Sequence, residues 1–161
     1  MKEKQKDNKK KELIDPYLKP VIIGGLFNTI LSMIFAPGIF IWSALSGYIA
    51  VITAYNLTRK LIPTIDGVLI GVFTGIFGGT FLDVLTIISL KTPENQRLII
   101  RTLEKNWPKE LSIPANLNEI LPSVFITTSI LIILVSIICA VVGSCLGMMI
   151  TRKKKEREEL K

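Results

Sequence analysis

The chain contains no histidine and only two cysteines, and these shortages exclude several kinds of site. Without histidine there is no histidine-based metal or catalytic centre. Cys139 and Cys145 lie in one apolar run, and their spacing places them about 240° apart around a helix, so they cannot form a disulfide with each other. No Ser–Lys or paired-carboxylate arrangement suggests an enzyme either. We therefore expect no catalytic residue, no cofactor and no metal.

Charged residues are almost missing from four long apolar runs, residues 17–36, 39–58, 65–90 and 121–150. About 20 helical residues cross the hydrocarbon layer of a membrane, which is ~30 Å thick. The sequence therefore predicts an all-α, polytopic membrane protein with four transmembrane helices as two hairpins in residues 17–150. The first run is strongly apolar only over residues 21–36, so a re-entrant segment is the alternative there.

The basic residues are distributed unevenly around these runs. Of the 20 Lys and Arg, 15 lie before the strongly apolar part of the first run (residue 21), between the second and third runs, or after the fourth, and five lie between the third and fourth. Because basic loops stay inside, both termini are predicted to be cytoplasmic in a multi-pass protein of the cell membrane. Residues 1–16 form a Lys-rich tail, disordered or lying on the surface, and residues 151–161 a charged helical tail.

These tails indicate the partners that the charge favours. Anionic lipid headgroups attract clusters of Lys and Arg next to a membrane. No aromatic residue is interleaved with the lysines before Tyr17, which argues against nucleic acid. Membrane lipids are therefore the expected partners of the tails.

The loop of residues 91–119, on the predicted outer side, contains a short amphipathic helix. Thr92 and Pro93 provide a capping hydroxyl and a proline at the first helical position. Apolar residues at spacings of three and four then continue to Trp107, which is expected at headgroup depth. This interfacial helix, residues 92–107, is either a docking surface or lid over the bundle or only a connector.

Glycine is spaced regularly in the third and fourth runs. Gly67, Gly71, Gly75 and Gly79 follow one another every four residues, and Gly143 and Gly147 repeat that spacing. Small residues let helices approach closely inside a membrane. The six glycines are therefore predicted to pack helices together. Whether the partner helix is in the same chain or in another copy stays open, and a homo-oligomer or a larger membrane complex is expected.

One carboxyl group, Asp83, lies inside the third run. An ionisable residue in the membrane is costly and normally faces the bundle or a cavity. Residues at similar depth and a mid-membrane amide complete a predicted intramembrane polar cluster: Asp83, Ser32, Ser43 or Ser46, Thr127, Thr128 and Asn28. The cluster either handles protons or cations or is a structural knot of hydrogen bonds.

The two halves of the chain are weakly alike. Residues 24–34 are similar to residues 78–88, and aligning residues 58–60 with 151–153 overlays Ser43 on Ser136 and Gly47 on Ala140. Two tandem hairpins of the same orientation would make a parallel repeat. Chance similarity between apolar segments is the alternative.

The stretch from Gly24 through Ser46-Gly47-Tyr48-Ile49-Ala50 to Asp66-Gly67, with the glycines at positions 71, 75, 78 and 79, carries a resemblance. It resembles small glycine-rich four-span membrane proteins of prokaryotes, archaea among them, whose function is unknown. That resemblance implies no activity. The sequence thus favours a non-enzymatic assembly or accessory module, and the alternative is a small ion- or proton-coupled transporter or channel that uses Asp83.

Overall fold

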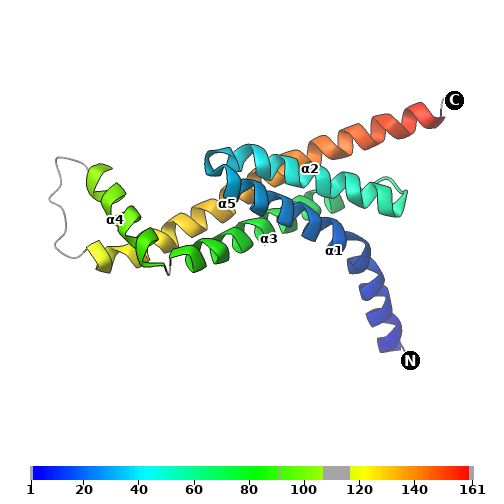
Figure 1. Cartoon of the computed structure of the whole chain (residues 1–161). Coiled ribbons are helices and arrows are strands. Elements are labelled where there is room, and N and C mark those ends of the chain that lie inside the picture. Colours follow the sequence, from blue (N-terminus) through cyan, green and yellow to red (C-terminus); the bar gives the residue numbers. More distant parts are fainter. Residues whose placement is uncertain (1, 91, 107–116, 160–161) are drawn as a thin grey trace.

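The structure is a computed structural model, and it describes residues 2–90, 92–106 and 117–159. These residues form α1 (Lys2–Ile34), the 3-10 turn η1 (Ala36–Gly38), α2 (Ile39–Thr58), α3 (Thr64–Leu90), α4 (Pro93–Asn106) and α5 (Leu117–Glu159) (Figure 1). The prediction of an all-α fold is confirmed.

Four of the helices are long and apolar enough to cross a membrane, which is the architecture of a multi-pass membrane protein. Their apolar segments are Pro16–Ile34, Ile39–Thr58, Thr64–Ser89 and Ser123–Glu158, so the first three lie within two residues of the predicted runs. Helix α5 has 43 residues. Its length of about 64 Å is twice the ~30 Å of the hydrocarbon layer, so it extends beyond that layer.

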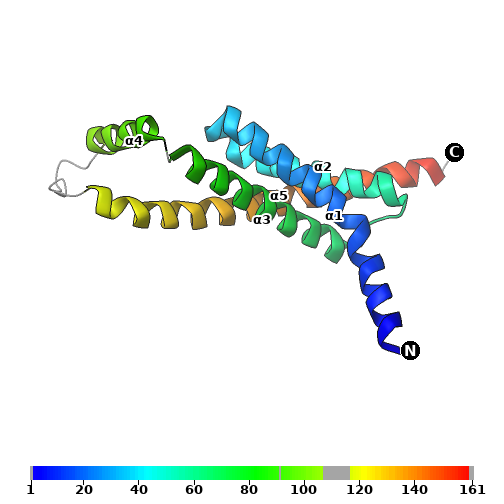
Figure 2. The ribbon, with the colours of Figure 1, turned by 60° about the horizontal axis from the view of Figure 1, so that its bottom comes forward.

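Helix α1 differs from the sequence-based prediction at both of its ends. It begins at Lys2, where a disordered or surface-lying tail was expected, because Lys and Glu are good helix formers that extend the apolar segment. Pro16 and Pro20 lie inside the helix, and it bends in this region (Figures 1 and 2). Proline explains the bend because it removes a backbone hydrogen bond. The segment after the bend continues as one helix along the bundle to Ile34, two residues before the predicted end of the run.

Two short turns connect the first three apolar helices. The Trp42 indole N–H donates to the Phe35 carbonyl over 3.2 Å, and its ring occupies the space that a side chain at Gly38 would need. Helix α2 ends at Arg59, whose left-handed backbone lets its N–H bond to the Tyr55 carbonyl over 2.8 Å. Helices α1 and α2 therefore form the predicted hairpin.

The termini lie at one end of the bundle, and α4 lies at the other (Figures 1 and 2). Helices α1 and α3 point toward α4, and α2 and α5 point away from it. Helix α5 packs extensively on α3 and α2, and α1 packs on α2 and α3. At the end that carries the termini, called here the tail end, Arg152 donates to the Thr64 hydroxyl over 2.9 Å. There the Tyr17 hydroxyl also donates to Asp66 over 3.3 Å, which fastens α1 to α3.

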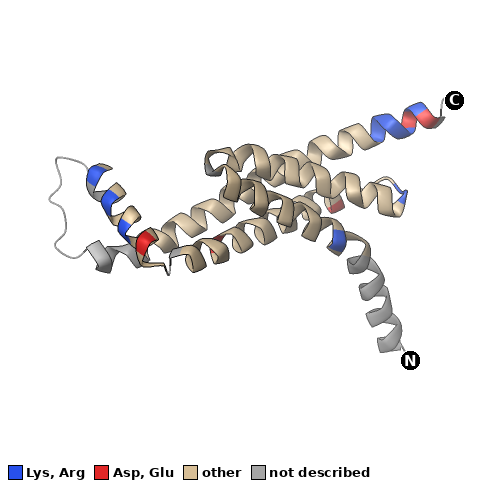
Figure 3. Ribbon diagram, in the orientation of Figure 1, with Lys and Arg blue, Asp and Glu red and all other residues tan. Residues whose placement is uncertain are grey.

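The charged side chains of the described helices gather at the two ends of the bundle, as Figure 3 shows. The tail end carries Lys19, Arg59, Lys60 and the basic residues after Thr151, and the α4 end carries Arg97, Arg101 and Lys105. The long middle section of the described bundle is uncharged apart from Asp83. This distribution is what a chain crossing a membrane four times requires.

We expect a membrane-impermeant thiol reagent applied to intact cells to label Lys105→Cys and not Lys154→Cys, in a background of Cys139→Ala and Cys145→Ala. The reason is the excess of Lys and Arg at the tail end, which the positive-inside rule places in the cytoplasm. Permeabilised cells, in which both positions react, are the control. Labelling at position 154 alone would reverse the orientation.

Helix α4 starts at Pro93, as the sequence predicts, and ends at Asn106. The Thr92 hydroxyl donates to the Ser89 carbonyl at 2.6 Å, and the Thr92 carbonyl accepts from the Gln96 N–H over 3.2 Å at the start of the helix. Trp107 and the loop residues that follow it, to residue 116, lie outside the described residues. Helix α4 therefore forms the described part of the predicted outer helix.

Candidate functional site

The glycines of α3 face α5 in a regular series of close contacts. A Cβ atom at Gly75 would lie 2.5 Å from the Ile137 Cα, and one at Gly71 would lie 2.8 Å from the Val141 Cα. At Gly67 it would overlap the Met148 side chain, and at Gly79 it would lie 3.1 Å from the Ile133 Cα. At Gly71 and Gly75 the neighbouring atoms include backbone atoms of α5, so only glycine allows the two helices to approach this closely there.

Helices α2 and α5 approach each other even more closely. A Cβ atom at Gly47 would overlap the Ala140 carbonyl oxygen, and one at Gly143 would overlap the Ala44 carbonyl oxygen. Farther along, Gly147 faces Val51, whose Cβ would lie 3.1 Å from an added Cβ. The structure thus places all six packing glycines of the sequence analysis, at positions 67, 71, 75, 79, 143 and 147, against another helix of the same chain.

A layer of polar side chains joins three helices inside the bundle. The Ser43 hydroxyl on α2 donates to the Asn28 side-chain oxygen on α1 over 3.0 Å and lies 3.4 Å from the Ser136 hydroxyl on α5. Ser32, one turn beyond Asn28, donates to the same oxygen over 3.5 Å. All four residues are buried. We call Asn28, Ser32, Ser43 and Ser136 the hydroxyl layer.

Helix α3 meets this layer with its backbone. The Thr29 hydroxyl lies 3.0 Å from the Gly25 carbonyl and 3.1 Å from the Gly78 carbonyl, which links α1 to α3. The amide nitrogen of Asn28 packs against Gly78, where an added Cβ would lie 2.9 Å away. That nitrogen and the Thr74 hydroxyl are buried without a hydrogen-bond partner. The interior of the bundle around this layer therefore retains two polar atoms, one of them on α3, whose hydrogen-bonding capacity is unused.

Asp83 lies outside the hydroxyl layer. It is five residues beyond Gly78 and hence roughly 7 Å closer to the α4 end. The side chain is 8% exposed, and the hydroxyl that interacts with it is that of Ser129 on α5. This pair continues the α3–α5 series, since Gly79 faces Ile133 and Asp83 faces Ser129. The single cluster predicted from the sequence is thus two separate sites.

Three members of the predicted cluster are elsewhere. Thr127 and Thr128 are exposed, and the Thr127 hydroxyl donates to the Ser123 carbonyl of its own helix. The prediction that they join Asp83 is wrong, because the α3–α5 series brings Ser129 to that carboxyl. Ser46 is buried, but its hydroxyl donates to the Ser43 carbonyl over 2.7 Å and so joins no other helix.

The two hairpins meet at positions that the internal repeat aligns. Ser43 lies beside Ser136, and Gly47 lies against Ala140, and each pair is overlaid when the two halves of the sequence are aligned. Contact between equivalent positions is expected where two similar hairpins pack around a common axis. The predicted cluster omitted Ser136, a member of the hydroxyl layer. The alignment of the two halves indicates this residue, because it overlays Ser136 on Ser43.

Comparisons of the chain with protein-family models, with curated proteins and with solved structures find no match. Among the described residues, no three His, Cys, Asp or Glu side chains lie close enough to hold a metal ion. The two polar sites form hydrogen bonds between helices, and within a membrane such bonds hold helices together.

Proposed function

We propose that this protein is a non-enzymatic membrane module that assembles with a further transmembrane helix, either of a second copy or of a larger complex. The glycines of α3 and α5 already contact other helices of the same chain, so they are not available to a further helix. The exposed face of α5 is the surface that contacts this further helix. Of the most apolar window of α5, 11% is buried, whereas 39% is buried in each of the other three spans.

The exposed face of α5 has the spacing of a helix-packing seam. Leu131, Leu134, Ile138 and Val142 are all exposed and follow one another at intervals of three and four residues. Such intervals place side chains along one stripe, which interlocks with the stripe of a partner helix. We call these four residues the α5 seam, and its position on the least buried span is the observation that supports the proposal.

Cross-linking in native membranes tests this assembly. Leu134→Cys, in the background of Cys139→Ala and Cys145→Ala, is expected to give one adduct of defined mass that also co-purifies in mild detergent. Phe73→Cys on α3 is the matched control, because Phe73 is 55% exposed and Leu134 is 52% exposed. The mass of the adduct identifies a second copy or a different protein. Equal cross-linking at both positions, or at neither, contradicts the proposal.

A second candidate is a small transporter or channel that uses Asp83. The observation in its favour is a buried carboxyl inside a span, close to a bundle layer that holds two unpaired polar atoms. Intramembrane carboxyls often mark proton or ion pathways. However, the residue that interacts with Asp83 is a single serine, and no second charged side chain lies in the apolar middle of the described bundle.

Asparagine at position 83 separates the two roles. If the carboxyl is structural, Asp83→Asn keeps the stability of the bundle because the amide still bonds to Ser129, whereas Asp83→Leu lowers it by about 1 kcal/mol. If the carboxyl serves transport, Asp83→Asn abolishes pH- or cation-dependent flux into liposomes although the fold is intact. We expect the structural result. Thermal unfolding in detergent measures the stability, and flux into liposomes is measured with the unmodified chain as reference. A flux that the unmodified chain supports and Asp83→Asn abolishes would favour the transporter.

A further inference from the structure

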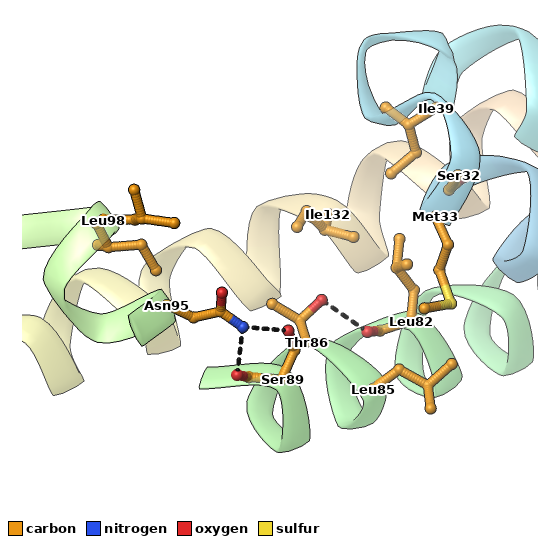
Figure 4. Close-up of a pocket in the computed structure, with 11 residues that line it drawn as sticks. Ser32, Met33, Ile39, Leu82, Leu85, Thr86, Ser89, Asn95, Leu98 and Ile132 are labelled. Carbon is orange, nitrogen blue, oxygen red and sulfur yellow. Dashed lines mark hydrogen bonds between the residues drawn. The ribbon is translucent and has the colours of Figure 1, made fainter. Parts of the chain in front are cut away.

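A cavity of about 580 Å³ opens at the α4 end of the bundle. Helix α3 forms its floor with Leu82 and Leu85, and the tip of the α1–α2 hairpin closes one side with Met33 and Ile39 (Figure 4). Helix α4 forms the opposite side and α5 stands behind. Binding sites for small molecules commonly have volumes of about 300 to 1,000 Å³, so the cavity is large enough for a ligand.

The lining of this cavity is uncharged and divides into an apolar part and a polar edge. Leu98 on α4 and Ile132 on α5 complete the apolar part. The polar edge lies where α3 ends and α4 begins. There the Asn95 amide donates to the Ser89 carbonyl over 2.8 Å and to the Ser89 hydroxyl over 3.0 Å. Since no charged side chain lines the cavity and apolar side chains outnumber the polar ones (Ser32, Thr86, Ser89 and Asn95), the cavity suits an uncharged and mainly apolar group.

Basic residues adjoin the cavity on α4. Arg97, Arg101 and Lys105 follow one another every four residues and are exposed (Figure 3). Around the helix, Arg101 and Lys105 lie about 60° and 20° from Leu98, and about 160° and 120° from Ile99, the other apolar α4 residue of the lining. The carboxylate in the first turn is Glu94, which lies nearer to α3. The two cationic side chains thus lie beyond the Leu98 edge of the cavity, on the side away from α3.

We propose that this cavity binds one acyl chain of an anionic phospholipid, whose headgroup pairs with Arg101 and Lys105. The cavity begins beside the last apolar turns of α3 and ends on amphipathic α4, which is where hydrocarbon gives way to headgroups. An acyl chain covers Leu82, Leu85 and Leu98, which otherwise form an open apolar wall. Phosphate oxygens accept strong hydrogen bonds from Arg and Lys, so an anionic headgroup complements the outer turns of α4.

Photochemical labelling tests the apolar half of the site. The full chain is reconstituted in phosphatidylcholine vesicles that contain a trace of phosphatidylglycerol with a diazirine on its acyl chain. We expect saturable labelling of peptides that contain Leu85 and Ile132, removed by Ile132→Trp, which fills the cavity. The matched control is the nearby Ile130→Trp, because Ile130 is 55% exposed and lies about 160° from Ile132 around the helix. Leu98→Trp, which is on α4 and outside the bundle core, also fills the cavity. It replaces Ile132→Trp in the test if that variant does not fold.

The headgroup half is tested by charge removal. Each basic residue near an anionic lipid contributes about fivefold in affinity, so Arg101→Gln and Lys105→Gln should each lower labelling by about that factor. Lys153→Gln makes the same change of one charge at the tail end and should leave the labelling unaltered. Labelling that does not saturate, that persists in both cavity-filling variants, or that is equal with a phosphatidylcholine probe overturns the proposal.

Discussion

Replacing Gly143 by alanine is expected to destabilise the bundle by at least about 3 kcal/mol, the upper end of the range for overpacking a core. The added methyl group would overlap the Ala44 carbonyl oxygen, which belongs to a helix backbone and cannot rotate away. Gly47→Ala should behave similarly, because its methyl group would overlap the Ala140 carbonyl oxygen. Helices α2 and α5 would have to separate in either variant.

The matched control is Gly79→Ala, in which the new methyl group meets Ile133 at 3.1 Å. A shift of a few tenths of an ångström relieves that contact, and alanine gains up to about 1 kcal/mol in helix propensity over glycine. Gly79→Ala is therefore expected to be nearly neutral. Unfolding by heat or by sodium dodecyl sulfate in mixed micelles measures all three variants. Equal stability of Gly143→Ala and Gly79→Ala would show that the α2–α5 contact is looser than described.

Removing the amide of Asn28 is the second large change that we expect. Asn28→Leu takes away the oxygen that accepts hydrogen bonds from Ser43 and Ser32, and it leaves both hydroxyls in an apolar interior. Each lost bond between transmembrane helices contributes about 0.6 to 1.7 kcal/mol. Since the branched side chain must also pack against Gly78, a total loss of about 2 kcal/mol is expected.

A double-mutant cycle identifies the hydrogen bond as the cause. Ser43→Ala removes the hydroxyl that Asn28→Leu deprives of its shorter hydrogen bond, leaving only the 3.4 Å contact with Ser136. The double variant should therefore be more stable than the sum of the two single losses predicts. Ile30→Leu, an exposed change on the same helix, controls for altered packing against lipid or detergent. Strict additivity would mean that the hydroxyl layer contributes no coupling energy between α1 and α2.

The membrane-spanning helices could be located from the sequence because the signal is strong and local. Runs without charge determine them, and so the predicted Ile39–Thr58 span coincides with α2. The spacing of Gly67, Gly71, Gly75 and Gly79 predicted a packing face for a similar reason. What the spacing could not give is the partner, because a glycine face is equally suited to a helix of the same chain and to one of another copy.

The polar sites were harder to predict because depth along a helix does not determine direction around it. Thr127, Thr128 and Ser129 lie at nearly the same depth, and only the register between α3 and α5 brings Ser129 to Asp83. That register follows from the glycine contacts. Continuing the contacts of Gly75 and Gly79 by one turn leads to Ser129, but this requires knowledge of which helix pairs with α3.

Because α5 follows α2 and α3 in the chain and packs on both of them, the order of synthesis has a consequence. The glycine faces of α2 and α3 enter the membrane before the helix that covers them exists. Until α5 is inserted, those faces are open to lipid or to other nascent helices, and the α1–α2 hairpin and α3 have only each other as partners. A ribosome that stalls before residue 117 would therefore release an incomplete bundle with its tightest packing surfaces uncovered, a ready substrate for membrane proteases and insertion chaperones.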